Sequence, residues 1–144
     1  MQMNTTLKLV NENTLYLCDS TDKIIVQQKP RWTKFEQVKR VKDNCNIVKE
    51  SDVNFPKDTN GKANIYCLDD TFRVRWTVDA PFENDSFPNP IVWDKATVEN
   101  KNEAGYLTLD TVDNPKTFIC SSWKGITVTV DYDTGQTITT EFTK

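Results

Sequence analysis

The sequence contains no histidine, which removes the residue on which several common enzyme sites depend. Serine and cysteine nucleophiles are usually activated by an imidazole base, and most catalytic zinc sites use imidazole ligands. A cysteine acting without histidine would need another base and surroundings that stabilise its thiolate, and no motif in the sequence supplies them. The chain is therefore predicted not to be an enzyme, and no cofactor is predicted for it.

Two further patterns could support catalysis, but neither has the context that it needs. Ser121 and Lys124 have the Ser-x-x-Lys spacing of penicillin-recognising enzymes, in which the two side chains lie one helical turn apart. Here the stretch continues an alternating strand, where they would point in opposite directions. Carboxylate pairs, as in glycosidases, could form among five strand-associated aspartates: Asp69, Asp70, Asp79, Asp94 and Asp110. Because 21 acidic residues produce such pairs by chance, a small hydrolase is the third hypothesis.

The segment 131–136, of sequence DYDTGQ, holds the weak candidates for a metal site. Asp131 and Asp133 lie two positions apart and precede Gly135. Calcium binds carboxylate oxygens, but it needs about six to eight oxygen ligands, and only two carboxylates are in view. A hairpin loop with Gly135 in the left-handed conformation accounts for every residue of the segment. The hairpin is the favoured interpretation, and no metal is predicted.

Aromatic residues in and after the proline-rich segment 80–90 are candidates for binding. Phe82 and Phe87 lie among prolines and polar residues, and Trp93 follows the segment. Exposed aromatic side chains on a stiff loop are good anchors for a protein partner or a sugar ring. The favoured interpretation is nevertheless that both phenylalanines fold back into the end of the core, because large apolar side chains strongly prefer burial.

Arg73 and Arg75 lie side by side on the polar face of a predicted strand at 71–79. The opposite face of that strand is formed by Phe72, Val74, Trp76 and Val78. A period of two residues predicts that the apolar set is buried and that both arginines lie on the wetter face. A solvated or salt-bridged surface is the favoured interpretation of the arginines. The alternative is a polar protein–protein contact, in which arginine is enriched.

Segments of alternating apolar and polar residues dominate the rest of the chain. Residues 5–10, 14–19 and 23–29 predict a three-stranded meander with short turns. Further strands are predicted at 46–50, 62–68, 71–79, 91–99, 105–112 and 116–123, with two more near the C-terminal end. About nine or ten short strands predict an all-β fold, a mainly antiparallel β-sandwich or barrel, in a single domain spanning residues 1–144. Nothing repeats at a fixed period, which argues against a solenoid or propeller.

One short helix is predicted at 34–43, where the period of two breaks down. Apolar residues recur there at spacings of three and four: Trp32, Phe35, Val38, Val41 and Cys45. Thr33 and Glu36 have the spacing of a capping box, and three cations near residue 40 suit the C-terminal end of a helix.

The charge of the chain is nearly balanced, with 18 basic and 21 acidic residues and a net charge of −3. Nucleic-acid binding needs a basic surplus, so nucleic acid is not predicted as a partner. No apolar run approaches the roughly 20 residues of a membrane span. The first ten residues lack a signal-peptide pattern, so the protein is expected to stay where it is made or to have lost a signal beforehand.

The four cysteines are Cys18, Cys45, Cys67 and Cys120. Their spacings match no short metal or redox motif, and a chain of 144 residues does not depend on disulfides for its core. Buried free thiols are favoured over two disulfides, because cysteine in an apolar strand behaves as a small hydrophobic residue.

The leading functional hypothesis is a non-enzymatic structural or accessory subunit of a larger assembly. A viral or phage particle component of the decoration or connector type is the favoured example, with other protein subunits, or other copies of this chain, as partners. The alternative is a secreted or surface module that binds carbohydrate or protein through its loop aromatics. These hypotheses place the chain in a virion or similar assembly, or outside the cell after removal of a signal.

Overall fold

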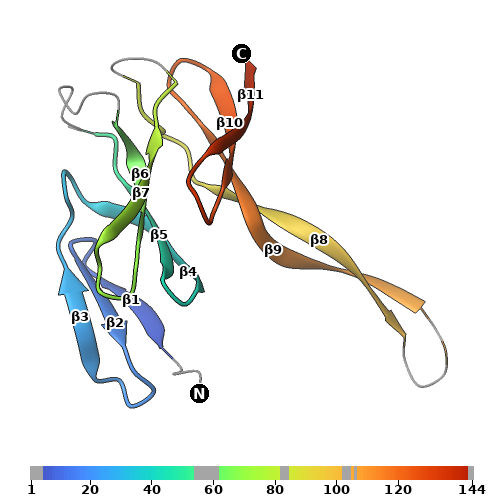
Figure 1. The fold of residues 1–144 in the computed structure, drawn as a ribbon, viewed down its shortest axis with the longest axis horizontal. Helices are drawn as coiled ribbons and strands as arrows, with labels where there is room; N and C mark the ends of the chain where they lie inside the picture. The colour runs from blue at the N-terminus through green and yellow to red at the C-terminus, as the bar shows by residue number, and fades with distance from the viewer. Residues whose placement is uncertain (1–4, 54–61, 82–84, 102–104, 106, 143–144) are drawn as a thin grey trace.

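Figure 1 shows the fold, a computed structural model with eleven β-strands and no helix among the residues described. The structure describes residues 5–53, 62–81, 85–101, 105 and 107–142, and the side chains of these residues except 62–63, 94–101 and 107–115. The strands form three antiparallel sheets. The predicted all-β class with a mainly antiparallel, sandwich-like arrangement is confirmed.

Each sheet is a meander, in which strands that follow one another in the chain lie next to one another. The first sheet contains β1 (Thr6–Val10), β2 (Thr14–Cys18) and β3 (Ile24–Gln28). The second contains β4 (Phe35–Lys42), β5 (Cys45–Glu50), β6 (Lys62–Leu68) and β7 (Val74–Asp79). The third contains β8 (Val92–Lys101), β9 (Leu107–Ser121), β10 (Ile126–Asp131) and β11 (Thr137–Phe142).

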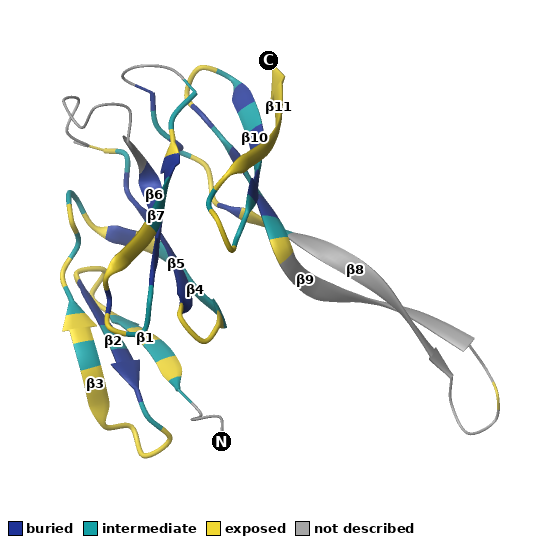
Figure 2. Ribbon diagram, viewed as in Figure 1, coloured by how far each residue is buried: buried dark blue, intermediate teal, exposed yellow. Residues whose placement is uncertain are grey.

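The second sheet lies between the other two, so the molecule has three layers and two cores (Figure 1). Its strand β5 is buried at all six positions, because alternate residues face different cores (Figure 2). The core against the first sheet contains Leu15, Leu17, Phe35, Val48, Tyr66, Leu68 and Phe72. The core against the third sheet includes Ile47, Ile65, Cys67, Val78, Phe118, Cys120, Val128 and Val130. All four cysteines are buried as free thiols.

The helix predicted at 34–43 is wrong, because these residues form strand β4. The register between β4 and β5 shifts twice, once between Phe35 and Gln37 and once between Arg40 and Lys42. Each shift adds one residue to β4, and an added residue changes the spacing of buried positions from two to three. Phe35 and Val38 pack in the first core, whereas Val41 packs against the second. Two β-bulges therefore imitate the apolar spacing of a helix.

The turns that follow β2 and β6 have the same hydrogen bonds. Asp19 Oδ1 accepts from the Thr21 N–H at 2.9 Å, the Thr21 hydroxyl at 2.7 Å and the Lys23 N–H at 3.0 Å. Asp69 Oδ1 accepts from Thr71 at 2.8 and 2.7 Å and from the Arg73 N–H at 3.0 Å. Such a side chain satisfies backbone donors that a tight turn leaves unpaired.

The turn after β10 is the same structure with one residue added. Asp131 Oδ1 accepts from the N–H groups of Asp133 at 2.8 Å and Thr134 at 3.1 Å. The residue two positions before the next strand has a positive φ in all three turns: Asp22 at 63°, Phe72 at 61° and Gly135 at 72°. The β9–β10 turn shares the pattern, because the Ile126 N–H donates to Ser122 Oγ at 3.3 Å and Gly125 has a φ of 84°. One turn design therefore recurs in four hairpins. The three aspartates are 50 and 62 positions apart, so this repeat has no fixed period in the sequence.

Candidate functional site

The first sheet has three strands, whereas each of the other two has four, and no described strand pairs with the outer edge of β1. An open edge presents unpaired backbone N–H and C=O groups, which form a template for another strand.

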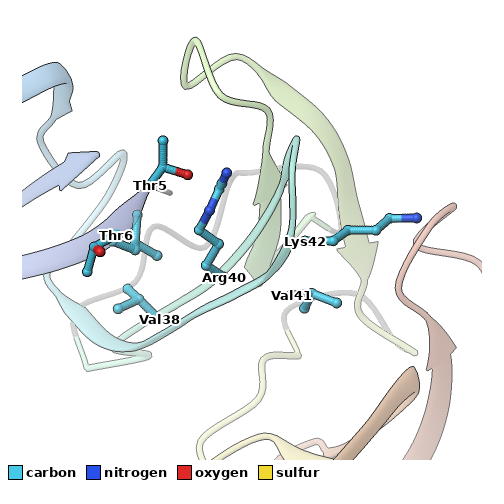
Figure 3. Close-up of a pocket in the computed structure, with 7 residues that line it drawn as sticks. Thr5, Thr6, Val38, Arg40, Val41 and Lys42 are labelled. Atoms are coloured by element: carbon cyan, nitrogen blue, oxygen red, sulfur yellow. The ribbon is translucent and has the colours of Figure 1, made fainter. Parts of the chain in front are cut away.

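A cavity of about 440 Å³ lies along this open edge, between the β1 segment and β4. Figure 3 shows Thr5 and Thr6 across from Val38 and Arg40. Leu7, Val41 and Lys42 complete the lining. The hydroxyl of Thr5 is buried and has no hydrogen-bond partner among the described residues. Such an unsatisfied group favours any occupant that supplies a polar partner.

The guanidinium of Arg40, at the wall of the cavity, is held by an ion pair and further hydrogen bonds. Its Nη1 donates to Asp70 at 2.7 Å and Asn46 at 2.9 Å, and its Nη2 donates to Asp43 at 2.9 Å and Asp70 at 3.1 Å. Burial alone would raise the pKa of Asp70, but hydrogen bonds from Arg40 and Asn46 hold that pKa below its usual value. The bond to Asp70 is the main reason why the pKa of Arg40 is raised. This ion pair ties β4 to the turn after β6.

The structure separates the two arginines that the sequence placed together. Arg73 is exposed in the turn after β6, and its N–H donates to Asp69. The guanidinium of Arg75 donates to the carbonyls of Asn44 at 2.8 Å and Asp133 at 3.1 Å. It therefore joins the β4–β5 turn to the turn of the third sheet, so it is an anchor between layers.

The predicted apolar face of 71–79 is only partly correct. Val78 is buried and Trp76 packs against the core shared with the third sheet, but Val74 is 42% exposed and Phe72 lies in the other core. The register of β7 shifts opposite Cys67 and Leu68, and this shift breaks the alternation.

The two metal candidates, Asp131 and Asp133, form hydrogen bonds and an ion pair at the β10–β11 turn. Asp131 accepts backbone hydrogen bonds within the turn, and the carboxylate of Asp133 forms an ion pair with Lys42 at 2.8 Å. In the part of the chain that the structure describes, no group of three or more Cys, Asp or Glu side chains is placed to hold a metal. This geometry agrees with the hairpin interpretation.

The loop aromatics do not form an exposed patch in the described structure. Phe87 is fully buried, and Asn64 holds its backbone through bonds of 2.9 Å to its N–H and 2.8 Å to its carbonyl. Trp93 is partly buried, 5.4 Å from the ring of Phe118, with the Lys39 ammonium 4.7 Å from its own ring. Phe82 lies outside the described residues. The favoured interpretation, burial in the core, therefore holds for Phe87.

The structure describes the side chains of three strand-associated aspartates, Asp69, Asp70 and Asp79, and Asp79 is exposed at the end of β7. Asp69 caps its turn, and Asp70 is bound to Arg40. The side chains of Asp94 and Asp110 lie outside the described residues.

Sequence reasoning missed Glu50, a fully buried carboxylate. It accepts hydrogen bonds from the N–H groups of Arg31 at 2.7 Å, Trp32 at 2.9 Å and Thr33 at 2.8 Å, and from the hydroxyl of Tyr66. Burial, followed by the nearby charge of Glu50, raises the pKa of Tyr66. These contacts fix the connection from the first to the second sheet. No signal in the sequence distinguishes this glutamate from an exposed one at the end of a strand.

Two parts of the third sheet are open to other molecules. All six residues of β11 are exposed, including Ile138 at 54% and Phe142 at 69%. Strands β8 and β9 extend from the body as a two-stranded arm (Figure 1). The arm is paired from Lys95 opposite Asp113 to Lys101 opposite Leu107, beyond the part of β9 that also pairs with β10.

Comparison with known proteins assigns no family. No family model matches the chain, and no curated protein matches it. Among solved structures, the chain is similar to the crystal structure of BamB from Moraxella catarrhalis, with 11% identity and a TM-score of 0.37. The match covers 98% of this chain and 50% of that one, so the chain spans about half the length of that protein. A likeness this remote bears on neither family nor function. Within the described residues, no helix is long and apolar enough to cross a membrane.

Proposed function

We propose that the chain is a non-enzymatic subunit of a larger assembly, such as a viral or phage particle, and that it acts through protein–protein contacts. Its charged clusters join turns and layers, and its largest aromatic side chains mostly fill the cores. Among the described residues, strand β11 and the arm are two features available to a partner.

The arm formed by β8 and β9 is the observation that carries this proposal. Its seven successive residue pairs span roughly 20 Å at about 3.4 Å per residue. A two-stranded ribbon without a third strand or a covering layer is only marginally stable in water. A partner that covers the ribbon would stabilise it, which is how arms join the subunits of an assembly.

Site-specific photocrosslinking tests this role in the cells that produce the protein. A photoreactive benzophenone amino acid replaces Thr97 or Thr111, which are paired across the arm, in the full-length chain. The matched control carries the same group at Thr71, an exposed residue in a turn of the body. We expect both arm positions to form crosslinks with another polypeptide, including another copy of the chain, at a yield well above that of the control.

The outcome is read by mass spectrometry of the crosslinked species. Crosslinks from Thr97 and Thr111 to one defined surface of a partner would support the assembly role. If neither position gives more crosslinked product than Thr71, the arm does not contact a partner and the proposal fails.

A further inference from the structure

The outer edge of β1 pairs with no described strand and borders the cavity. A further strand at this edge would satisfy its unpaired backbone N–H and C=O groups.

Strand β11 has properties that suit this edge. It has six residues against five in β1, and no described strand pairs with its outer edge. Phe142 is exposed next to Glu141, a combination of an apolar side chain and a negative charge. The edge of β1 offers the complement, because Leu7 lines the cavity and Lys8 is an exposed cation.

A single copy cannot bring these two edges together, because β1 and β11 lie in the two outer layers with the second sheet between them (Figure 1). Any pairing of β11 with β1 is therefore between molecules. Exposed edge strands with apolar side chains are strong candidates for such pairing.

We propose that β11 of a second copy adds antiparallel to β1 and completes the first sheet. The register places Leu7 opposite Phe142 and Lys8 opposite Glu141, with Leu9 opposite Thr140. Phe142 then lies on the face of β1 that carries Leu7 and enters the cavity beside Val38. Opposite charges and apolar pairs directly across two strands both stabilise a sheet. This inference rests on the proposed assembly role, for which it names a partner.

Such a contact joins two different surfaces, so each copy has one donor edge and one acceptor edge. Two copies could exchange both edges around a twofold axis, or several copies could close a ring. In either case, blocking one edge on every copy removes the association. Mixing a copy blocked at β1 with a copy blocked at β11 leaves one intact contact, which predicts a one-to-one complex.

Charge reversal tests the register by sedimentation-velocity ultracentrifugation of the full-length chain over a range of concentrations. We expect the wild type to self-associate above the 16.6 kDa monomer. Lys8→Glu and Glu141→Lys should each weaken association by about tenfold, because an attractive cross-strand pair becomes repulsive. The double variant Lys8→Glu/Glu141→Lys should regain most of the wild-type affinity.

Three further variants test whether self-association depends on the β1–β11 contact itself and not on a general change in charge or stability. Phe142→Lys should be monomeric, and Thr6→Pro should be too, because proline is tolerated at the first residue of a strand yet blunts its edge. A mixture of the two should form the one-to-one complex. Asp22→Asn removes the 2.8 Å ion pair of Lys8 within its own copy and should leave association unchanged. Circular dichroism of each variant checks that it is folded.

A monomeric wild type at several hundred micromolar would overturn the inference, while the photocrosslinks from the arm could still support the assembly role. Association that survives both Phe142→Lys and Thr6→Pro would also overturn it, because a different surface would then be responsible. Failure of the charge-reversed double variant to recover, with both single variants folded, would reject the proposed register. If the chain self-associates but the arm forms no crosslinks, the β1–β11 contact stands and the proposed role of the arm in assembly is rejected.

Discussion

The buried carboxylate of Glu50 allows the sharpest test of how the layers are joined. Its two oxygens accept four hydrogen bonds, three from consecutive backbone N–H groups and one from the hydroxyl of Tyr66. Replacement by alanine leaves all four donors without this acceptor. A hydrogen bond to a charged group contributes about 1.5–3 kcal/mol, but the sum is an upper limit because water can reach the partly exposed segment 31–33. We expect Glu50→Ala to lower the free energy of unfolding by about 3–5 kcal/mol.

Two more conservative substitutions, Glu50→Gln and Tyr66→Phe, show how much of this loss of stability comes from individual hydrogen bonds to the carboxylate. Glu50→Gln preserves shape but places an amide NH₂ where one oxygen accepted from Arg31, and should cost about 1.5–3 kcal/mol. Tyr66→Phe removes one donor and leaves the three backbone bonds, and should cost about 1–2 kcal/mol. Glu12→Gln is the matched control, because Glu12 is exposed and its ion pair with Lys34 is 3.5 Å long. That control should change stability by less than about 0.5 kcal/mol.

Urea unfolding followed by tryptophan fluorescence measures these differences. With a slope of about 2 kcal/mol per molar urea, the loss expected for Glu50→Ala moves the midpoint by about 2 M. A shift no larger than that of Glu12→Gln, with an unchanged slope, would refute the reasoning. It would mean that segment 30–33 is held by packing and that its N–H groups are equally well satisfied by water.

The second core and its turns can be tested by a glycine substitution and by pH. Gly135→Ala should destabilise the fold by about 2–4 kcal/mol in the same urea assay, because its φ is 72° and an added Cβ would lie 2.5–2.7 Å from the indole of Trp76. Gly125→Ala, at a φ of 84°, is the control that measures the cost of backbone strain alone. If both substitutions lower the free energy of unfolding equally, the contact with the indole of Trp76 has no role. Stability should also fall above about pH 9, since burial raises the pKa of Cys120 to about 12 and raises that of Tyr66. These groups remain protonated in the folded chain while the unfolded chain loses their protons, so stability is complete below about pH 8.5 and declines by up to about 1.4 kcal/mol per pH unit for each group. Cys120→Ala should make the decline between about pH 9 and 11 shallower, and an unchanged slope would contradict the assignment to that thiol.

The class of the fold could be predicted from the sequence, because strand alternation is a local property that needs no knowledge of neighbours. The meander at 5–29, the strand at 62–68 and the hairpin around Gly135 were all predictable from alternation and turn residues. The burial of the cysteines also followed from their apolar surroundings. These features depend on residues within one strand or one turn, so a single stretch of sequence contains the necessary information.

Which residues face which core, in contrast, depends on how the strands pair and stack. Strand β4 resembled a helix because two bulges, set by its register with β5, changed the spacing of its buried residues. The same kind of register shift separated Arg75 from Arg73, and a bulge cannot be read from one strand alone. Glu50 became a buried anchor through donors 16 to 19 positions away, so only folding brings its partners to it. The open edge of β1 is likewise decided by the sheet topology, because the sequence of one strand does not show which strands pair with it.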